Sequence, residues 1–92
     1  MAVKLEQIIG ETAKASDVTV EQILGSDRTP DVLTARQLAL YVARKNTTFS
    51  LPQIAAAFGK THAAVIHAVR QMEQRLGEEE ELRDRYKRLL EI

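Results

Sequence analysis

The chain has 92 residues, 45% of them apolar and none of them cysteine, so it can bury one modest core but cannot form disulfides or use thiolate chemistry. Its 13 basic and 13 acidic residues give no net charge, which by itself argues against nucleic-acid binding. No apolar run approaches the length of a membrane span and the N-terminus lacks a signal-peptide pattern, so we expect a cytoplasmic protein with no membrane partner.

The N-terminal part predicts two short helices. Apolar residues at helical spacing predict the first over Val3–Thr12, followed by a connection over residues 15–18. Thr19 and Gln22 have the spacing of a capping box, in which each side chain bonds the other residue's backbone N–H. They open a brief helix that stops at Gly25.

A loop and a longer helix follow. Residues 26–33 contain a proline, two aspartates and no periodicity, so we expect a loop in which Arg28 is the one basic residue. Thr34 and Gln37 have the spacing of a second capping box and predict a helix from there to about Asn46. Its apolar positions make it the expected central helix of the fold: Ala35, Leu38, Ala39 and Val42.

Residues 50–76 predict two helices joined by a very short turn. Ser50 and Gln53 form a further capping box, and Gly59 can take the left-handed conformation that ends a helix. The second helix starts within about three residues of this glycine, so the two helices must cross steeply, as in a helix-turn-helix. The second helix carries one buried stripe at spacings of four, three and four: Val65, Val69, Met72 and Leu76.

The C-terminal part predicts one more helix after a break at Gly77. Residues 78–81 would form its first turn, and Lys87 and Arg88 its last, both matching the helix dipole. Its apolar stripe is Leu82, Tyr86, Leu89 and Leu90. We therefore expect an all-α fold, a compact Trp-repressor-like bundle of about six helices in a single domain over residues 1–92, with its helix-turn-helix over about 50–76.

The charge is unevenly distributed along the chain. Residues 28–76 carry seven basic and two acidic groups, whereas the flanks, residues 1–27 and 77–92, are both acidic. A layout of this kind can present a positive face to phosphates. Small and polar residues at the start of the second motif helix suit a major groove, and they point outward in the predicted pattern: Lys60, Thr61, His62, Ala63, Ala64, His67, Arg70 and Gln71. Binding of double-stranded DNA is the expected function.

Residues 49–76 resemble the C-terminal DNA-binding domain of the DnaA family of bacterial chromosomal replication initiators. The family pattern S-x-P-E-I-G-x-x-F-G-G-R-D-H-T-T-V-x-H-A corresponds here to SLPQIAAAFGKTHAAVIHA, with one residue fewer at the turn. Upstream, TARQLALYVARK over residues 34–45 is similar to the family's PRQ-x-A-M-x-L helix. The resemblance extends in register over nearly the whole chain.

The resemblance implies recognition of a short asymmetric duplex site, the DnaA box, at the replication origin, and hence association with the nucleoid. It also implies the ATPase domain of a parent initiator as a further partner, and no cofactor for this domain. By position it implies a minor-groove contact from Arg28 and phosphate and base contacts from Arg36 and Gln37. It also implies that the helix end at Leu51 and Pro52 abuts the DNA. The implied recognition segment consists of Lys60, Thr61, His62, Ala63 and Ala64.

Some of these residues have alternative interpretations. Lys60 at a helix N-terminus opposes the dipole, so we expect either a phosphate partner or simple solvent exposure. His62 could contact a base edge or cap its helix, and His67 could contact a phosphate or only solvent. The two histidines have poor spacing for a metal site, and no nucleophile, base and orienting residue converge, so we expect neither a metal nor an enzyme.

The sequence also departs from the family pattern. Thr61 replaces an aspartate, Ala63 and Ala64 replace threonines, and aspartates flank Arg28 where the family is often basic. Alanine keeps only an apolar contact with a thymine methyl group. Two other interpretations therefore stay open: a stand-alone regulator of the same fold that binds another site, and a protein-interaction module in which box specificity is altered or lost.

Overall fold

A computed structural model describes residues 4–91 of the chain, and within this range the fold consists of helices without a strand. This confirms the all-helical fold predicted from the sequence. The helices of the described range are α1 (Leu5–Ser16), α2 (Val20–Leu24), α3 (Pro30–Asn46), α4 (Leu51–Phe58), α5 (His62–Glu78) and α6 (Glu80–Leu89).

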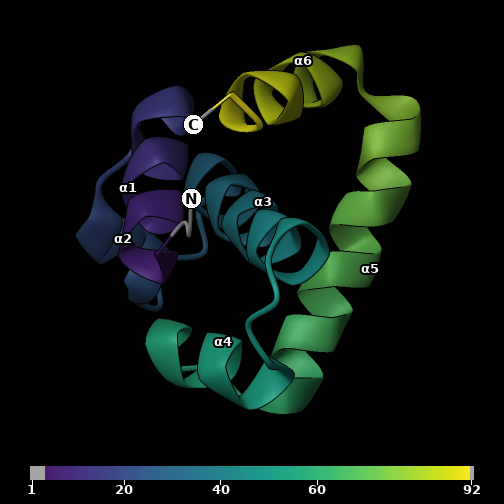
Figure 1. The fold of residues 1–92 in the computed structure, drawn as a ribbon. Helices are drawn as coiled ribbons and strands as arrows, with labels where there is room; N and C mark the ends of the chain where they lie inside the picture. Colours follow the sequence, from purple (N-terminus) through teal and green to yellow (C-terminus); the bar gives the residue numbers. More distant parts are fainter. Residues whose placement is uncertain (1–3, 92) are drawn as a thin grey trace.

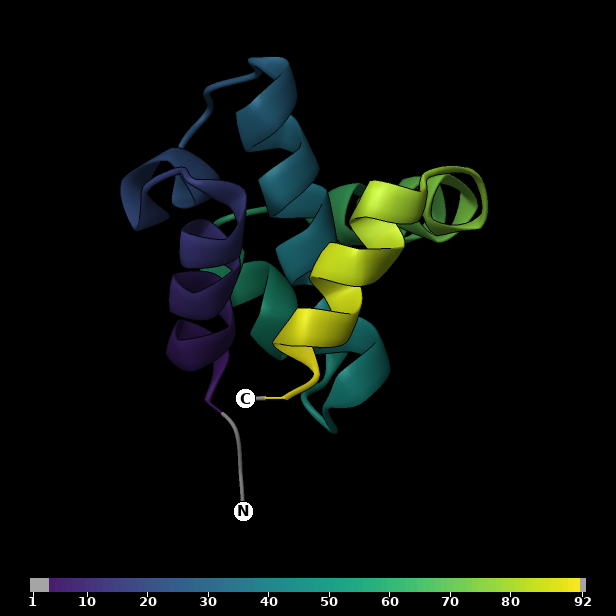
Figure 2. The ribbon, with the colours of Figure 1, turned by 90° about the horizontal axis from the view of Figure 1, so that it is seen from above.

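Helix α3 lies at the centre of the molecule. Helices α1 and α2 cover one side of it and α5 and α6 the other, while α4 lies across the end of α5 (Figures 1 and 2). From Ala35 to Leu40 every residue of α3 is buried, which is typical of a helix enclosed on all sides. The largest fully buried side chains include Ile8, Ile23, Leu38, Leu40, Ile54, Phe58, Met72 and Leu82, so every helix contributes to one core.

Helix α1 is longer at its C-terminal end than the sequence predicted. It continues to Ser16, and Thr12 is buried within it and donates its hydroxyl to Ile8 O at 2.7 Å. Asp17, with φ 56°, takes the left-handed conformation that ends the helix, a role usually filled by glycine. The predicted start at Val3 lies outside the described residues.

The predicted start of α3 was wrong. The helix begins at Pro30, so the loop expected over residues 26–33 is shorter, and Thr34 lies inside the helix instead of capping it. Proline is favoured at the first helical position, where its missing N–H has no partner to lose. Asp27 Oδ1 accepts the Thr29 N–H at 2.9 Å and shapes the turn that leads into the helix.

The break between α5 and α6 also lies later than predicted. Gly77 is part of α5, which ends at Glu78, and the backbone becomes extended only at Glu79. The Arg83 side chain donates to Leu76 O at 2.8 Å and satisfies a carbonyl at the end of α5. Leu90 lies beyond α6 and is 47% exposed, so it does not belong to the predicted apolar stripe.

Candidate nucleic-acid interface

The turn between α4 and α5 is formed by a glycine and a side-chain cap. Gly59 has φ 63°, in the left-handed region that glycine adopts without strain. The Lys60 N–H donates to Ala55 O at 2.9 Å and closes α4, while Thr61 Oγ1 accepts the Ala64 N–H at 3.1 Å and begins α5. The two helices therefore cross steeply, as Figure 1 shows, in the predicted helix-turn-helix.

The opposite end of α4 has the capping box that the sequence predicted. Ser50 Oγ accepts the Gln53 N–H at 3.2 Å, and Gln53 Oε1 accepts the Ser50 N–H at 2.8 Å. Leu51 and Pro52 form the first turn, where Leu51 is half-buried and Pro52 is exposed. This helix start is held rigidly, so the two side chains have a fixed place beside α5.

Helix α5 buries one stripe and exposes the opposite one. The predicted stripe of Val65, Val69, Met72 and Leu76 is buried. The exposed side chains of its first turns include His62, Ala63, Ala64, Ile66, His67 and Arg70. The Thr61 hydroxyl is already used to cap the helix. The outward surface is therefore a ridge of mostly small and polar side chains, with Ile66 as its large apolar member.

A hollow of about 180 Å³ lies on one flank of this ridge and is lined by basic groups. We call it the basic hollow; its lining includes Arg28, Arg36, Gln37, Lys60, Ala64 and His67. Arg28 comes from the loop between α2 and α3, Lys60 from the turn before α5, and His67 from α5 itself. Arg28, Arg36 and Lys60, from three parts of the sequence, thus bring positive charge to one place.

The electrostatics of the basic hollow favour an anion. Burial, followed by repulsion from Arg36 and Arg28, lowers the pKa of Lys60. Burial is also the main cause of the lowered pKa of Arg36, whereas the nearby Asp27 carboxylate acts in the opposite direction. Crowded cations of this kind are relieved when a phosphate binds between them.

Arg36 lies beneath the basic hollow more than at its surface. Its side chain is 7% exposed, and Nε donates to Ile23 O at 2.7 Å. Nη2 donates to Gln22 O at 2.8 Å and to Asp27 O at 2.9 Å. These bonds fasten α2 and the Arg28 loop to α3. The structure therefore gives Arg36 a role in positioning the loop, and its phosphate contact stays a prediction from its sequence position.

Gln37 is likewise engaged within the fold. It is 8% exposed, and its Oε1 accepts a hydrogen bond from Arg75 Nη1 at 3.2 Å. This bond directs its side-chain oxygen towards α5, and its contact with a base edge stays a prediction.

A second hollow, of about 320 Å³, lies on the other flank of α5. We call it the Arg44 hollow; its lining includes Arg44, Lys45, Leu51, Ile66, Arg70 and Glu73. Lys45 Nζ lies 3.9 Å from Glu73 Oε1 at the surface, and Arg44 and Arg70 are exposed. Arg44, Lys45 and Arg70 were not among the predicted site residues, although the basic excess of residues 28–76 was the signal that included them.

Helical spacing places the two hollows on opposite flanks. The basic hollow is lined from α5 by residues 64, 67 and 68, and the Arg44 hollow by residues 65, 66, 69, 70 and 73. At about 100° per residue these two sets point in nearly opposite directions around the helix axis. Ala63 lies on the ridge between them. The start of α5 is thus an exposed ridge with positive charge on both sides.

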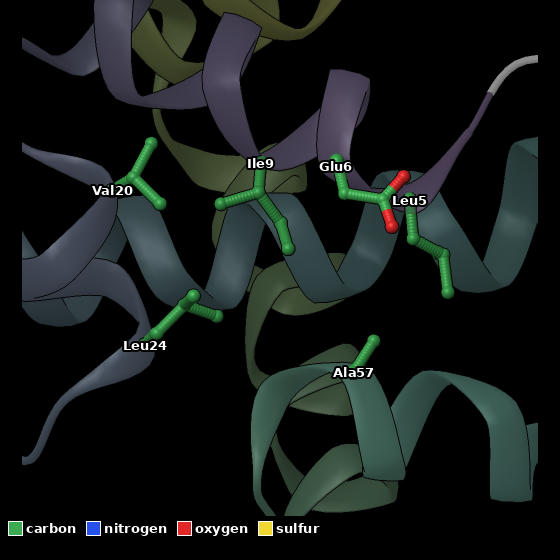
Figure 3. A pocket seen from close by; sticks show the side chains of 6 residues that line it. All are labelled: Leu5, Glu6, Ile9, Val20, Leu24 and Ala57. Atoms are coloured by element: carbon green, nitrogen blue, oxygen red, sulfur yellow. The ribbon is translucent and has the colours of Figure 1, made fainter.

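A third hollow, of about 140 Å³, is apolar and lies elsewhere, between α1, α2 and α4 (Figure 3). It is lined by Leu5, Glu6, Ile9, Val20, Leu24 and Ala57. Its one charged residue is acidic, so it contributes nothing to an interface for phosphates.

The residues from 4 to 91 include no group of three or more histidine, aspartate or glutamate side chains placed to hold a metal ion. Within the same range, no helix has both the length and the apolar composition to cross a membrane.

Comparison with known proteins gives consistent matches. Residues 5–72 match the family model described as the bacterial dnaA protein helix-turn-helix. The chain is 42% identical over 78 residues to the chromosomal replication initiator protein DnaA of Cutibacterium acnes, covering 84% of this chain and 16% of that protein. It is 37% identical over 81 residues to DnaA 1 of Protochlamydia amoebophila. It is 38% identical over 82 residues to DnaA of Streptococcus equi subsp. zooepidemicus. Each of these two matches covers 88% of this chain and 18% of the relative. The chain thus spans less than a fifth of the length of these relatives.

Proposed function

Because the chain belongs to the bacterial DnaA helix-turn-helix family, whose domains bind double-stranded DNA and are not catalytic, we propose that it recognises DnaA-box-like sites in the initiation of chromosome replication. The observation that carries this proposal is the exposed ridge at the start of α5 with a basic hollow on each flank. We also propose, from its relatives' length and name, that it acts beside the ATPase domain of a parent initiator at the nucleoid.

The ridge fits a major groove. That groove is about 12 Å wide and admits one helix, with a phosphate backbone along each of its two edges. If the first turns of α5 enter the groove, the basic hollow faces one backbone and the Arg44 hollow the other. Positive charge on both flanks supports this orientation better than one in which α5 only lies along the duplex surface.

The Arg28 loop fits the adjacent minor groove. The backbone next to the basic hollow separates the major groove from the neighbouring minor groove, and Arg28 lines that hollow from the loop between α2 and α3. An exposed arginine in this place can extend into the minor groove, whose potential attracts cations. A phosphate of the intervening strand would then be held between His67 and the loop.

The assignment of contacts follows from this orientation. We propose base contacts from His62, Ala63 and Ala64, contacts at the groove edge from Leu51 and Pro52, and a minor-groove contact from Arg28. Phosphates are assigned to His67, Arg44, Lys45 and Arg70. Thr61, Arg36 and Gln37 support the interface by capping α5 and by holding the loop and α3 in place.

Fluorescence anisotropy with labelled duplexes tests the proposal. The chain is titrated against a DnaA-box duplex and a scrambled duplex of equal length at two salt concentrations. Tighter binding to the box, weakened by salt, is the expected result, because phosphate contacts release counterions. Equal binding to both duplexes would point to another site, and no binding to either would contradict the proposal and favour a protein partner.

A further inference from the structure

Lys60 connects the two elements that are proposed to read DNA. Its Nζ donates to Gly25 O at 2.9 Å, across 35 residues of sequence. Lys60 directly precedes Thr61, which caps α5, and Gly25 ends α2 three residues before Arg28. One hydrogen bond thus joins the turn of the helix-turn-helix to the loop that carries the minor-groove arginine.

The acceptor and the surroundings of this lysine suggest that its first role is inside the protein. Lys60 is half-buried, and its acceptor is a peptide carbonyl, whose position depends on the course of the loop backbone. The ion pairs found among residues 4–91 do not include Lys60. The position of the Lys60 ammonium group is therefore fixed by its hydrogen bond to Gly25 O.

Arg36, on α3, also bonds the backbone around Gly25. Its Nη2 donates to Asp27 O and Gln22 O, which lie on both sides of Gly25 in the sequence. Arg36 anchors the loop to the central helix, whereas the hydrogen bond from Lys60 ties it, within residues 4–91, to the start of the recognition helix. Removing Lys60 would leave the loop attached to α3 but no longer tied to α5.

We propose that Lys60 is a positioning residue that fixes the spacing between Arg28 and the start of α5, so that the minor-groove and major-groove parts of a DNA site are read at one separation. This inference rests on the proposed function. It makes the domain sensitive to the number of base pairs between the two parts, a property that a lysine acting only on a phosphate would not produce.

The test compares Lys60→Met with Lys45→Met. The first variant keeps most of the aliphatic stem but removes the donor, and the second removes an exposed lysine that does not touch the loop. The variants Arg28→Ala and His62→Ala first locate the minor-groove and major-groove parts of the DNA site, as the base pairs at which each variant loses preference. Binding is then measured by anisotropy on the preferred duplex and on duplexes with one base pair inserted or deleted between these two parts. Affinity on the preferred duplex is also measured against salt concentration.

We expect the wild type and Lys45→Met to prefer the original spacing by about tenfold, the scale of one mismatched base pair. For Lys60→Met this preference should fall to about twofold, below the cost of one mismatched base pair. The slope of log affinity against log salt concentration should stay at the wild-type value. In the DNA-free chain, the amides of residues 26–29 should exchange faster in Lys60→Met at unchanged melting temperature.

Two outcomes would overturn the inference. An equal loss of affinity at every spacing, with a salt slope smaller by about 1, would show that Lys60 acts as a phosphate contact. An unchanged spacing preference together with unchanged amide exchange would show that its bond to Gly25 has no positioning effect. If the wild type itself binds none of the duplexes, the failure lies in the proposed function, and it is recognised before any variant is compared.

Discussion

Arg75 Nη1 donates to Gln37 Oε1 at 3.2 Å and to Thr34 Oγ1 at 2.8 Å, so one guanidinium links the C-terminal half of α5 to the central helix α3. Its Nε and Nη2 atoms bond the Glu79 carboxylate at 2.8 and 3.2 Å. This network lies at the far end of α5 from the proposed DNA contacts. Because α5 is a single rigid helix, fastening one end sets the direction in which the other end projects.

Replacing Arg75 should therefore cost stability. Arg75→Ala removes four hydrogen bonds to three side chains, but the Arg75 side chain is 28% exposed, so we expect the free energy of unfolding to fall by about 1–2 kcal/mol. Urea denaturation measures this loss. The matched control is Arg70→Ala, an exposed arginine on the same helix, which should change stability by less than about 0.5 kcal/mol and yet weaken DNA binding. Equal stability of the two variants would contradict the assigned roles.

Replacing Arg36 should lower stability, whereas replacing Arg28 should weaken DNA binding, the same contrast as between Arg75 and Arg70. Arg36→Met leaves the carbonyls of Gln22, Ile23 and Asp27 without their donor in a mostly buried place, so the free energy of unfolding should fall by about 2–4 kcal/mol. Arg28→Met, at an exposed loop position, should leave stability unchanged and reduce DNA affinity. Thermal denaturation and anisotropy on the same samples separate the two effects, and a stable Arg36→Met domain would show that the loop needs no anchor.

The sequence predicted the family and the helical fold, and both are confirmed. The signals were local: capping boxes at Thr19 and Ser50 and a glycine at position 59, all of which the structure contains. The start of α3 was missed because a proline among aspartates is compatible with both a loop and a first helical turn. Gly77 was misplaced because a single glycine costs only about 1 kcal/mol in a helix, which packing readily offsets.

The site was harder to predict because its residues differ in what they bond inside the fold. Arg36, Gln37 and Lys60 look like surface polar residues in the sequence, and their acceptors or donors lie 9 to 38 residues away. Sequence pattern detects contacts between neighbours on one helix, but not bonds of this separation. The Arg44 hollow was missed for the same reason, since its basic residues come from α3 and α5.

Acid should weaken the link between α5 and α3. Hydrogen bonds donated by Arg75 lower the pKa of Glu79 below its usual 4.5. A carboxyl group with a lowered folded-state pKa stabilises the fold above pH 4.5, and this contribution is lost as the pH falls through the folded-state value. Urea midpoints measured from pH 6 to pH 3 should therefore decline less steeply in Glu79→Gln and in Arg75→Ala than in the wild type. Parallel curves would show that the pair does not contribute.

Two alanines of α5 should limit specificity. Ala63 and Ala64 are exposed at the start of the helix, and alanine offers a base only its methyl group. We expect Ala63→Thr with Ala64→Thr to raise the ratio of box to scrambled affinity, because each threonine adds a hydroxyl and keeps a methyl. Ala57→Thr, which places the same side chain beside the apolar hollow of α1, α2 and α4, is the control and should leave the ratio unchanged. An unchanged ratio in the double variant would place these positions outside the groove.

Salt dependence should follow the local cations and not the net charge, which is zero. Each lysine or arginine that releases a counterion from DNA contributes about 0.9 to the slope of log affinity against log salt. Removing Arg44 and Arg70 together, by Arg44→Ala with Arg70→Ala, should thus reduce the slope by about 2. Lys87→Ala with Arg88→Ala changes the net charge equally but lies on α6, away from both hollows, and should leave the slope as it is. Equal reductions in the two double variants would mean that the overall charge of the domain, and not the two flanks of α5, sets its attraction to DNA.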